Sequence, residues 1–219
     1  GNLTPIMYGS AAWGDYDDDG DLDILLSGED SNYSMVAEVW RNNGDGTFAD
    51  SGISNLTGLF MGSAVWGDYD NDGDLDILLT GSDAADNRVA KIWRNNGDGN
   101  FADSGITNLT GVGGSSAAWG DYDNDGDLDI FVPVEDLAPG LTDRLFENDG
   151  KGVFRDVSAA RGVQNPGSIN RGAVFCDFDN DGDLDLLAAN MPPGQARERH
   201  VPTTLFRNQL RESGEARFD

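Results

Sequence analysis

The sequence contains few residues that could crosslink the chain or bind an anionic partner. Cys176 is the only cysteine, so no internal disulfide can form, and packing or bound metal must provide rigidity. Only 14 residues are Lys or Arg, against 40 Asp or Glu, which gives a formal net charge of -26. Because nucleic acids and anionic membrane surfaces carry the same sign of charge, we exclude both as partners.

Long hydrophobic runs and a leader segment are also missing. No apolar stretch approaches the roughly 18–20 residues that a membrane helix needs, and no charged, then apolar leader opens the chain. We therefore expect no membrane insertion and a mature or excised segment. Hydrophobic residues nevertheless make up 38% of the chain and 30 residues are glycine, which predicts a packed core with many turns and not a disordered acidic tail.

Residues suited to catalysis are equally scarce. The chain has one histidine, no Gly-x-Ser-x-Gly nucleophile motif and no phosphate-binding loop. Its carboxylates recur with a spacing that fits metal ligation better than acid–base chemistry. We therefore predict no catalytic residues and no enzyme activity for this segment.

One acidic motif is repeated along the whole chain. Residues 13–23 read W-G-D-Y-D-D-D-G-D-L-D, and the pattern recurs at 66–76, at 119–129 and, with Phe-Cys in place of Trp-Gly, at 175–185. The first aspartates of these motifs are 53, 53 and 56 residues apart. A fixed period of this size predicts a repeat architecture, here with four units.

A second landmark follows each acidic motif at a nearly constant offset. Three aromatic residues lie 25 residues after the first aspartate and a fourth lies 29 after it, namely Trp40, Trp93, Phe146 and Phe206. Segments rich in Asn and Gly follow at 41–46, 94–99 and 147–152, and they end at Phe48, Phe101 and Phe154. We interpret them as tight hairpin turns, because Asn and Gly adopt positive φ at little cost. The fourth unit, 208–218, has four extra residues, lacks the Asn-Gly turn and ends at Phe218.

The segments between these turns are short and rich in Val, Ile, Leu and Trp. In the second unit they are 62–66, 75–80, 88–93 and 100–104. Such lengths predict strands and not helices. Four antiparallel strands in each unit predict an all-β fold, a β-propeller of four-stranded blades. We expect one propeller segment over 1–219, with blades at about 2–54, 55–107, 108–160 and 161–219. Each repeat is longer than the common propeller repeats of about 40–50 residues, because it contains the acidic loop.

Aspartates occupy positions 1, 3, 5, 7 and 9 of each acidic loop, with glycine at position 6. Two carboxylates about 4 Å apart repel by roughly 4 kcal/mol at an effective dielectric of 20, so a converging set requires a cation. Oxygen-only ligands on a flexible loop favour calcium over zinc, copper or magnesium. We predict about four Ca²⁺ ions, one per repeat, with these ligands: Asp15, Asp17, Asp19, Asp21 and Asp23; Asp68, Asp70, Asp72, Asp74 and Asp76; Asp121, Asp123, Asp125, Asp127 and Asp129; Asp177, Asp179, Asp181, Asp183 and Asp185.

Each loop position has an expected role, which the first loop illustrates. Asp15, Asp17 and Asp19 would provide side-chain oxygens, and the glycine at position 6 would permit a sharp turn. Asp21 would offer its backbone carbonyl, and Asp23 would complete the shell with both oxygens. An EF-hand begins similarly but needs Glu at position 12 and flanking helices. Position 12 is apolar in all four loops (Leu26, Leu79, Val132 and Ala188), so we exclude the EF-hand.

The pattern D-x-D-x-D-G-x-x-D between the first two strands of a blade resembles the FG-GAP/VCBS repeats of integrin-α-type propellers. The resemblance covers essentially the whole chain, although the Phe-Gly and Gly-Ala-Pro elements are replaced by Y-G-S-A at 8–11 and M-G-S-A at 61–64. It implies calcium in a hairpin loop on one face of the propeller. It also implies extracellular recognition or adhesion, since some relatives are lectins and others are noncatalytic parts of larger enzymes.

Aromatic residues at repeated positions have two interpretations, sugar stacking or packing between blades. A residue that recurs in every unit is better explained by packing, so we expect this role for Trp13, Trp66, Trp119 and Phe175. We expect Trp40 and Trp93 to lie in the core. Cys176 replaces a glycine, and we expect a small buried side chain there and not a nucleophile.

Segments that differ between units are better candidates for ligand binding, although no ligand residue can be assigned. They are 27–35, 80–87, 133–142 and 189–204. The last includes Arg197, Glu198, Arg199 and His200, which we interpret as a solvated loop, with contact to an acidic ligand as the alternative. Four Asn-x-Ser/Thr sequons predict either glycosylation or a duplicated turn motif; they lie at Asn2, Asn55, Asn108 and Asn32.

Two functional hypotheses follow. The first is a secreted or cell-surface calcium-binding module for recognition or adhesion, with a glycan or protein ligand and structural calcium. The alternative is a structural repeat subunit of an extracellular filament or coat, or a noncatalytic scaffold of a larger secreted enzyme. Propellers have about 4–8 blades, and open sheets need covering, so we expect an incomplete ring that is completed by additional blades or self-assembly.

Overall fold

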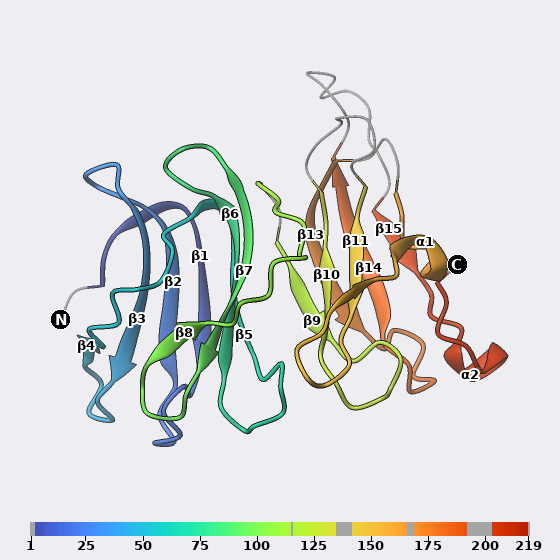
Figure 1. Cartoon of the computed structure of the whole chain (residues 1–219), viewed down its shortest axis with the longest axis horizontal. Coiled ribbons are helices and arrows are strands. Elements are labelled where there is room, and N and C mark those ends of the chain that lie inside the picture. Colours follow the sequence, from blue (N-terminus) through green and yellow to red (C-terminus); the bar gives the residue numbers. More distant parts are fainter. Residues whose placement is uncertain (1–2, 115, 135–141, 166–168, 192–202, 219) are drawn as a thin grey trace. The chain divides into compact units, whose positions relative to one another are not determined.

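The computed structural model describes residues 3–114, 116–134, 142–165, 169–191 and 203–218. Four small antiparallel sheets follow one another along the chain, and the only helices in the described ranges are two single turns. Neighbouring strands in each sheet are also neighbours in sequence, which is the up-and-down order of a propeller blade (Figure 1). The predicted all-β propeller fold is confirmed.

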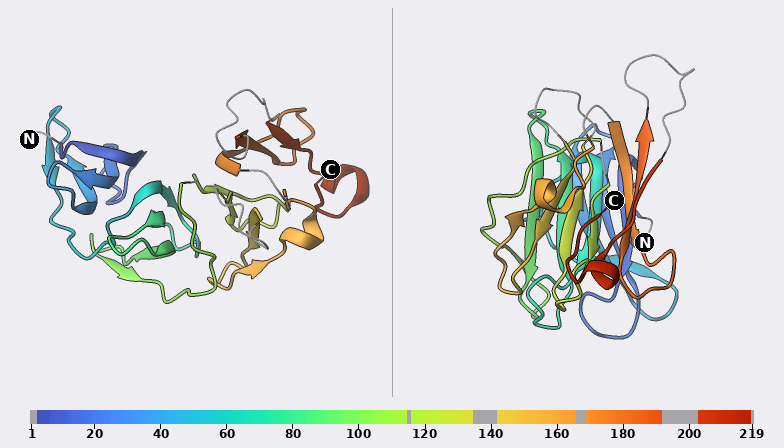
Figure 2. Two further views of the ribbon diagram at one scale, coloured as in Figure 1. Left: turned by 90° about the horizontal axis from the view of Figure 1, so that it is seen from above. Right: turned by 90° about the vertical axis from the view of Figure 1, so that its right-hand side faces the viewer.

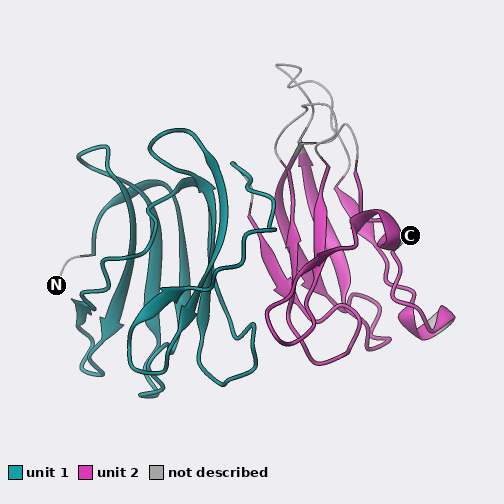
Figure 3. Cartoon of the chain, viewed as in Figure 1, with its two compact units in different colours: residues 1–114 teal, residues 115–219 magenta. Residues whose placement is uncertain are grey.

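The chain divides into two compact units, and the first, Gly1–Gly114, contains two blades (Figure 3). Its strands form two four-stranded sheets, which Figure 2 shows from two further directions. The first blade consists of β1 (Ile6–Gly14), β2 (Asp23–Asp30), β3 (Met35–Asn42) and β4 (Phe48–Asp50). The second consists of β5 (Phe60–Gly67), β6 (Asp76–Ser82), β7 (Arg88–Asn95) and β8 (Phe101–Asp103).

The second unit, Ser115–Asp219, contains the other two blades. The third blade consists of β9 (Ala118–Gly120), β10 (Asp129–Val132), β11 (Arg144–Glu147) and β12 (Arg155–Asp156), followed by the helical turn α1 (Ser158–Arg161). The fourth has three strands, β13 (Ile169–Cys176), β14 (Asp185–Met191) and β15 (Thr204–Phe206).

The fourth blade replaces its last strand by a single bridge. Asn208 pairs with Phe218, as Asn42 pairs with Phe48 in the first blade. The extra residues between them form the helical turn α2 (Leu210–Ser213), which explains why this unit has no Asn-Gly hairpin. Phe218 is 3% exposed, so it still contributes to the core.

Each unit has its own core between its two sheets. In unit 1, Leu25 and Val39 of the first sheet pack in one buried cluster with Ile77 and Leu79 of the second. In unit 2, the corresponding cluster includes Tyr122, Phe131 and Leu145 together with Leu186 and Ala188. In unit 1 the second strand of each blade, β2 or β6, is buried on both faces, which explains its nearly continuous apolar sequence.

The repeated aromatic residues pack on a glycine of the neighbouring blade. The ring of Trp66 covers Gly14, where an added Cβ would lie 2.6 Å from the ring, and Phe175 covers Gly120 at the same separation. Trp66 also lies parallel to Tyr16, with 6.2 Å between ring centroids. These contacts agree with packing between blades.

Three sequence expectations about buried residues are wrong. Trp13 is 61% exposed and Trp40 is only half-buried. Their equivalents in the second blade, Trp66 and Trp93, lie on the face that packs against the first blade. The same face of the first sheet has no blade against it in unit 1, so Trp13 and Trp40 are left partly exposed. Cys176 is half-buried, because it ends β13 at the rim of its sheet. Within the described ranges, neither helix has the length or hydrophobicity to cross a membrane.

Candidate metal sites

The four acidic loops join the first and second strands of their blades and share one backbone conformation. The residue at position 4 adopts a left-handed φ of 56–59° in every loop, at Asp18, Asn71, Asn124 and Asn180. The glycine at position 6 has φ between 92° and 96° in all four. Asn, Asp and Gly tolerate these angles better than other residues do, so the sequence itself selects the loop. In Figure 1 the loops of each unit lie at one end of its blades.

The aspartate at position 1 closes the loop onto itself. Asp15 accepts hydrogen bonds from the backbone N–H groups of Asp19 at 3.1 Å and Gly20 at 3.0 Å. The other three loops repeat this pair of bonds, with Asp68, Asp121 and Asp177 as acceptors. Position 1 therefore organises the turn before any ligand is considered.

The aspartate at position 9 is fully buried in each loop and joins three parts of the blade. Asp76 accepts hydrogen bonds from the backbone N–H groups of Tyr69 at 3.1 Å and Asn95 at 2.8 Å. The equivalent aspartates make the same two bonds; they are Asp23, Asp129 and Asp185. Burial raises the pKa of Asp76 to about 7 and that of Asp129 to about 8, because the carboxylate form is poorly solvated.

Carboxylates converge in every loop. Ligand atoms from positions 1, 3 and 9 lie within 4.8 Å of one another in the second, third and fourth loops, and those of positions 1, 3 and 5 do so in the first. At position 3, the Oδ1 atoms of Asp70 and Asp123 are buried and make no hydrogen bond. Burial raises the pKa of Asp123 to about 6. A buried carboxylate oxygen without a donor is unfavourable unless a cation satisfies it.

Positions 5 and 7 have other contacts. The carboxylate at position 5 accepts the backbone N–H of position 7 in all four loops. The carboxylates of Asp21, Asp74 and Asp127 lie against the hairpin glycines, where a Cβ on Gly44, for example, would lie 2.5 Å from Asp21 Oδ2. These position-7 side chains therefore sit in the hairpin turn and not among the converging carboxylates. Their expected role as backbone ligands stays a prediction.

An asparagine at or just beyond the end of each third strand joins the site, a role that the sequence did not lead us to expect. Asn95 donates its Nδ2 to the carbonyls of Leu75 at 3.2 Å and Tyr16 at 2.9 Å, so it links the loop of its own blade to that of the first. Asn42, Asn148 and Asn208 make the equivalent bond to their own loops. Its spacing from position 9, 19 residues in the first three units and 23 in the fourth, was the available signal. We interpreted this asparagine as a source of positive φ, but in these turns positive φ occurs at glycines.

Two of the sequon asparagines make hydrogen bonds outside the acidic loops. Asn55 donates its Nδ2 to the carbonyl of Phe101 at 2.5 Å, and Asn32 donates to Asp30 at 3.3 Å. Both bonds suit the duplicated turn motif, and glycosylation of any sequon stays a prediction. Asn2 and the basic cluster Arg197, Glu198, Arg199 and His200 lie outside the described residues.

The donor set fits a hard divalent cation. All converging atoms are carboxylate oxygens, and two of them are buried without a hydrogen bond. In the second, third and fourth loops, the aspartates at positions 1, 3 and 9 would hold the ion. In the first loop, those at positions 1, 3 and 5 would do so. Oxygen ligands are the preference of calcium and magnesium.

The fold and these loops define a propeller repeat protein with an acidic hairpin in every blade. The profile of the FG-GAP-like repeat family matches residues 15–79, 80–132 and 138–188, which is most of the chain. The chain therefore belongs to the FG-GAP-like repeat family.

Two curated relatives are cartilage acidic protein 1 from Xenopus tropicalis and from Mus musculus. The first is 32% identical over 117 residues, which cover 53% of this chain and 16% of the relative. The second is 34% identical over 89 residues, which cover 41% of this chain and 13% of the relative. The matched part thus spans less than a fifth of either relative.

One solved structure with the same fold is that of an Agrocybe aegerita lectin, described as recognising non-reducing terminal N-acetylglucosamine. It superimposes with a TM-score of 0.56 and 21% sequence identity, over 97% of this chain and 51% of the lectin chain. The repeat family together with these neighbours points to a non-catalytic binding module.

Proposed function

We propose that this chain is part of an extracellular calcium-binding propeller module for recognition or adhesion, in which calcium is structural. The observation that carries the proposal is the fourfold recurrence of converging carboxylates on loops of one conformation. A bound calcium ion would supply positive charge that offsets carboxylate repulsion in each loop. The similarity to cartilage acidic protein 1 supports an extracellular location.

Calcium should raise the stability of the chain, because the ion binds loops that exist only in the folded state. Extracellular modules bind calcium with dissociation constants of about 10⁻⁴–10⁻³ M. At a tenfold excess over such a constant, each occupied loop contributes about 1.4 kcal/mol. We expect the thermal midpoint to be higher in 10 mM calcium than in chelator. Magnesium at the same concentration is the control for ionic strength, and equal midpoints in chelator and calcium would contradict the proposal.

The end of the first blade opposite its acidic loop is our candidate for ligand recognition. Tyr33, between β2 and β3, is 77% exposed with φ of 62°, and Tyr8, at the β-bulge of β1, is 63% exposed with φ of 49°. The pairing of Met7 with Glu29 places both at this end. The equivalent residues of the second blade, Met61 and Asp86, share these left-handed angles, so the exposed tyrosine rings and not the backbone distinguish this end. Exposed aromatic rings also suit carbohydrate or protein ligands.

A glycan array tests recognition directly. We expect selective binding, with terminal N-acetylglucosamine as the first candidate because of the lectin with the same fold. Binding should fall at least tenfold in Tyr33→Ala. Asp86→Ala is the matched control, since Asp86 occupies the same left-handed position in the second blade. If no glycan is retained selectively, pull-down with extracellular matrix proteins tests the protein-ligand form, and failure of both contradicts recognition.

One observation favours the alternative function, a subunit that assembles with further blades. Leu187 and Leu205 are 36% and 41% exposed, whereas Leu25 and Val39, at the same repeat positions of the first blade, are completely buried. In the first blade these positions pack against the second. A further blade, from a longer chain or a second copy, would cover this face. Light scattering should then show concentration-dependent association that Leu205→Glu abolishes.

A further inference from the structure

The residue that follows the third-strand aromatic differs in charge between repeats. It is Arg41, Arg94, Glu147 and Arg207 in the four blades. This position lies next to the asparagine whose backbone N–H is bound by the position-9 aspartate. Its side chain can therefore reach the acidic loop of its own blade.

In the second loop, Arg94 occupies carboxylate oxygens that a cation would need. Its Nε lies 3.0 Å from Asp70 Oδ2, and its second guanidinium nitrogen lies 3.0 Å from Asp72 Oδ2. Asp70 is also one of the three converging carboxylates of this loop. One guanidinium thus bridges positions 3 and 5 with two charge-assisted contacts.

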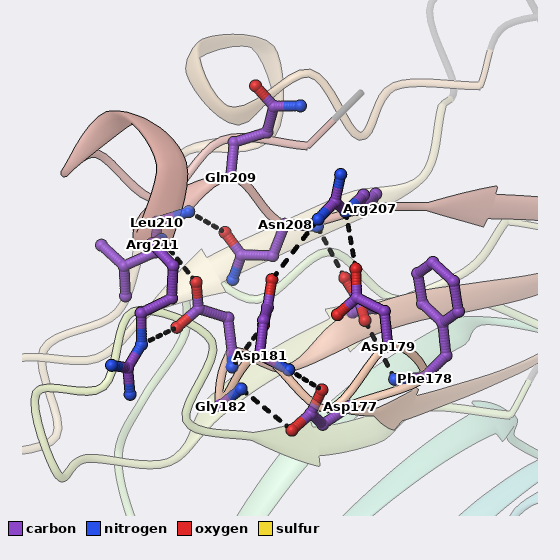
Figure 4. A network of polar contacts seen from close by, with 12 residues as sticks. Asp177, Phe178, Asp179, Asp181, Gly182, Arg207, Asn208, Gln209, Leu210 and Arg211 are labelled. Carbon is purple, nitrogen blue, oxygen red and sulfur yellow. Dashed lines mark hydrogen bonds and ion pairs between the residues drawn. The ribbon is translucent and has the colours of Figure 1, made fainter.

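The fourth loop has the same arrangement with an additional arginine. Arg207 Nε lies 2.8 Å from Asp179 Oδ2, and its guanidinium reaches Asp181 Oδ2 at 3.7 Å (Figure 4). Arg211, from α2, lies 3.2 Å from Asp183 Oδ1. Positions 3, 5 and 7 of this loop therefore all contact a guanidinium.

In the described structure no guanidinium lies on the converging carboxylates of the third loop, where Glu147 replaces the arginine. Arg161, from α1, lies nearby but binds Glu147 at 2.9 Å and the Tyr122 hydroxyl at 2.9 Å. The Tyr122 hydroxyl itself donates to Glu147 at 2.6 Å. Asp123 Oδ1 is left buried without a hydrogen bond. Glu147 thus gives this loop an acidic neighbour where the second and fourth loops have an arginine.

We propose that Arg94 and Arg207 are built-in counter-cations that compete with calcium, so that the third loop binds calcium more tightly than the second and fourth. The proposal rests on the calcium function proposed above. A calcium ion entering the second loop must displace the guanidinium from Asp70, whereas none has to leave the third loop. Arg94 is 45% exposed, which limits the strength of its ion pairs. We therefore expect about a fivefold to tenfold effect on the dissociation constant.

The same arginines would hold the second and fourth loops together when calcium is scarce. A guanidinium on positions 3 and 5 reduces carboxylate repulsion as an ion would, although less completely. The third loop has no such substitute. Its order should therefore depend most strongly on calcium.

Terbium luminescence can measure each loop in the intact chain. Terbium replaces calcium, and the tyrosine at position 2 sensitises its emission in the first three loops (Tyr16, Tyr69 and Tyr122), whereas the fourth loop has Phe178 there. Tyr16→Phe and Tyr69→Phe identify the first-loop and second-loop components by their loss, and the remaining component belongs to the third loop. In wild type, calcium should displace terbium from the third loop at a concentration about fivefold to tenfold lower than from the second. Equal constants, or a tighter second loop, would overturn the proposal.

Arg94→Gln is the decisive variant, with Lys91→Gln as its control. Lys91 lies on the same strand and changes charge equally, but its partner is Asp103 at 2.8 Å. Arg94→Gln should tighten calcium binding to the second loop about fivefold to tenfold and lower the thermal midpoint in chelator. Lys91→Gln should change the constant less than twofold. If Arg94→Gln does not fold, Arg94→Lys, which keeps the charge but loses the planar fork, should tighten binding by a smaller factor.

The outcomes separate this proposal from the proposed function. Unchanged or weaker calcium binding in the folded Arg94 variant would overturn the counter-cation role, while calcium binding by wild type would leave the module intact. Absence of saturable calcium or terbium binding by wild type would overturn the calcium function itself.

Discussion

Asp76→Ala should lower the free energy of unfolding by about 5 kcal/mol in the presence of calcium. Asp76 is completely buried and accepts the backbone N–H groups of Tyr69 and Asn95. Alanine leaves both donors unpaired at about 1–3 kcal/mol each. The loop also loses a converging carboxylate and with it the roughly 1.4 kcal/mol from an ion at tenfold excess. Urea denaturation in 10 mM calcium measures the total.

In chelator the loss should be smaller, which makes the comparison diagnostic. Burial raises the pKa of Asp76 to about 7, so the folded state retains a proton on this group that the unfolded state loses above about pH 4. Without an ion, the contribution of Asp76 to stability is therefore greatest below about pH 4 and falls as pH rises through 7. Alanine removes this unfavourable charge together with the hydrogen bonds. Losses of equal size in calcium and chelator would show that Asp76 is purely structural.

Asp74→Ala is the matched control for this variant. Asp74 belongs to the same loop, but its carboxylate lies against Gly97 in the hairpin turn and is not one of the three converging groups. It should leave both the unfolding free energy and its calcium dependence nearly unchanged. A calcium-dependent loss as large as that of Asp76→Ala would assign the position-7 side chain to the ion.

The blades were predictable because several independent signals coincide in each repeat. The strand periods, the glycine at position 6 and the aspartate spacing all favour one hairpin, and the structure gives that glycine a φ near 94° in every loop. The order of elements within a blade follows from connections too short for any other antiparallel pairing. The fourth blade was harder, since α2 replaces a hairpin with a segment whose sequence has no strong helical period.

The contacts between side chains of different segments were not predictable from spacing alone. Asn95 could be interpreted from sequence only as a turn residue, because its partner Tyr16 lies 79 positions earlier in the chain. Arg94 is similar, since nothing in its immediate sequence shows that its guanidinium lies on Asp70. Trp13 shows the opposite error. The repeated tryptophan predicts packing between blades at this position. In the first blade, however, no blade of unit 1 covers the sheet face that carries Trp13, so its side chain is exposed.

The β-bulge at the start of the first, second and fourth blades shows how backbone conformation and close packing are connected. In the second blade the pairing of β5 with β6 shifts between Phe60 and Ser63. Met61 adopts a left-handed φ of 51° in the bulge, and Gly62 is brought against the carbonyl of Thr80. Tyr8 and Gly114, at the equivalent positions of the first and third repeats, have φ of 49° and 77°, so the left-handed angle recurs in three repeats and does not depend on methionine.

Gly62→Ala should strongly destabilise unit 1. A Cβ at this position would lie 1.8 Å from the carbonyl oxygen of Thr80 and 2.5 Å from the Cα of Gly81. Both atoms are backbone, so β5 and β6 must separate where they pair, which exposes the core around Leu79. We expect a loss of more than about 4 kcal/mol, measured by urea denaturation. Gly172→Ala is the control, because its added Cβ would meet only Ala189 Cβ at 3.8 Å, and it should be almost neutral. Equal urea midpoints for the two variants would show that β5 and β6 do not approach each other this closely at Gly62. Our explanation of the glycine beside this bulge would then be wrong.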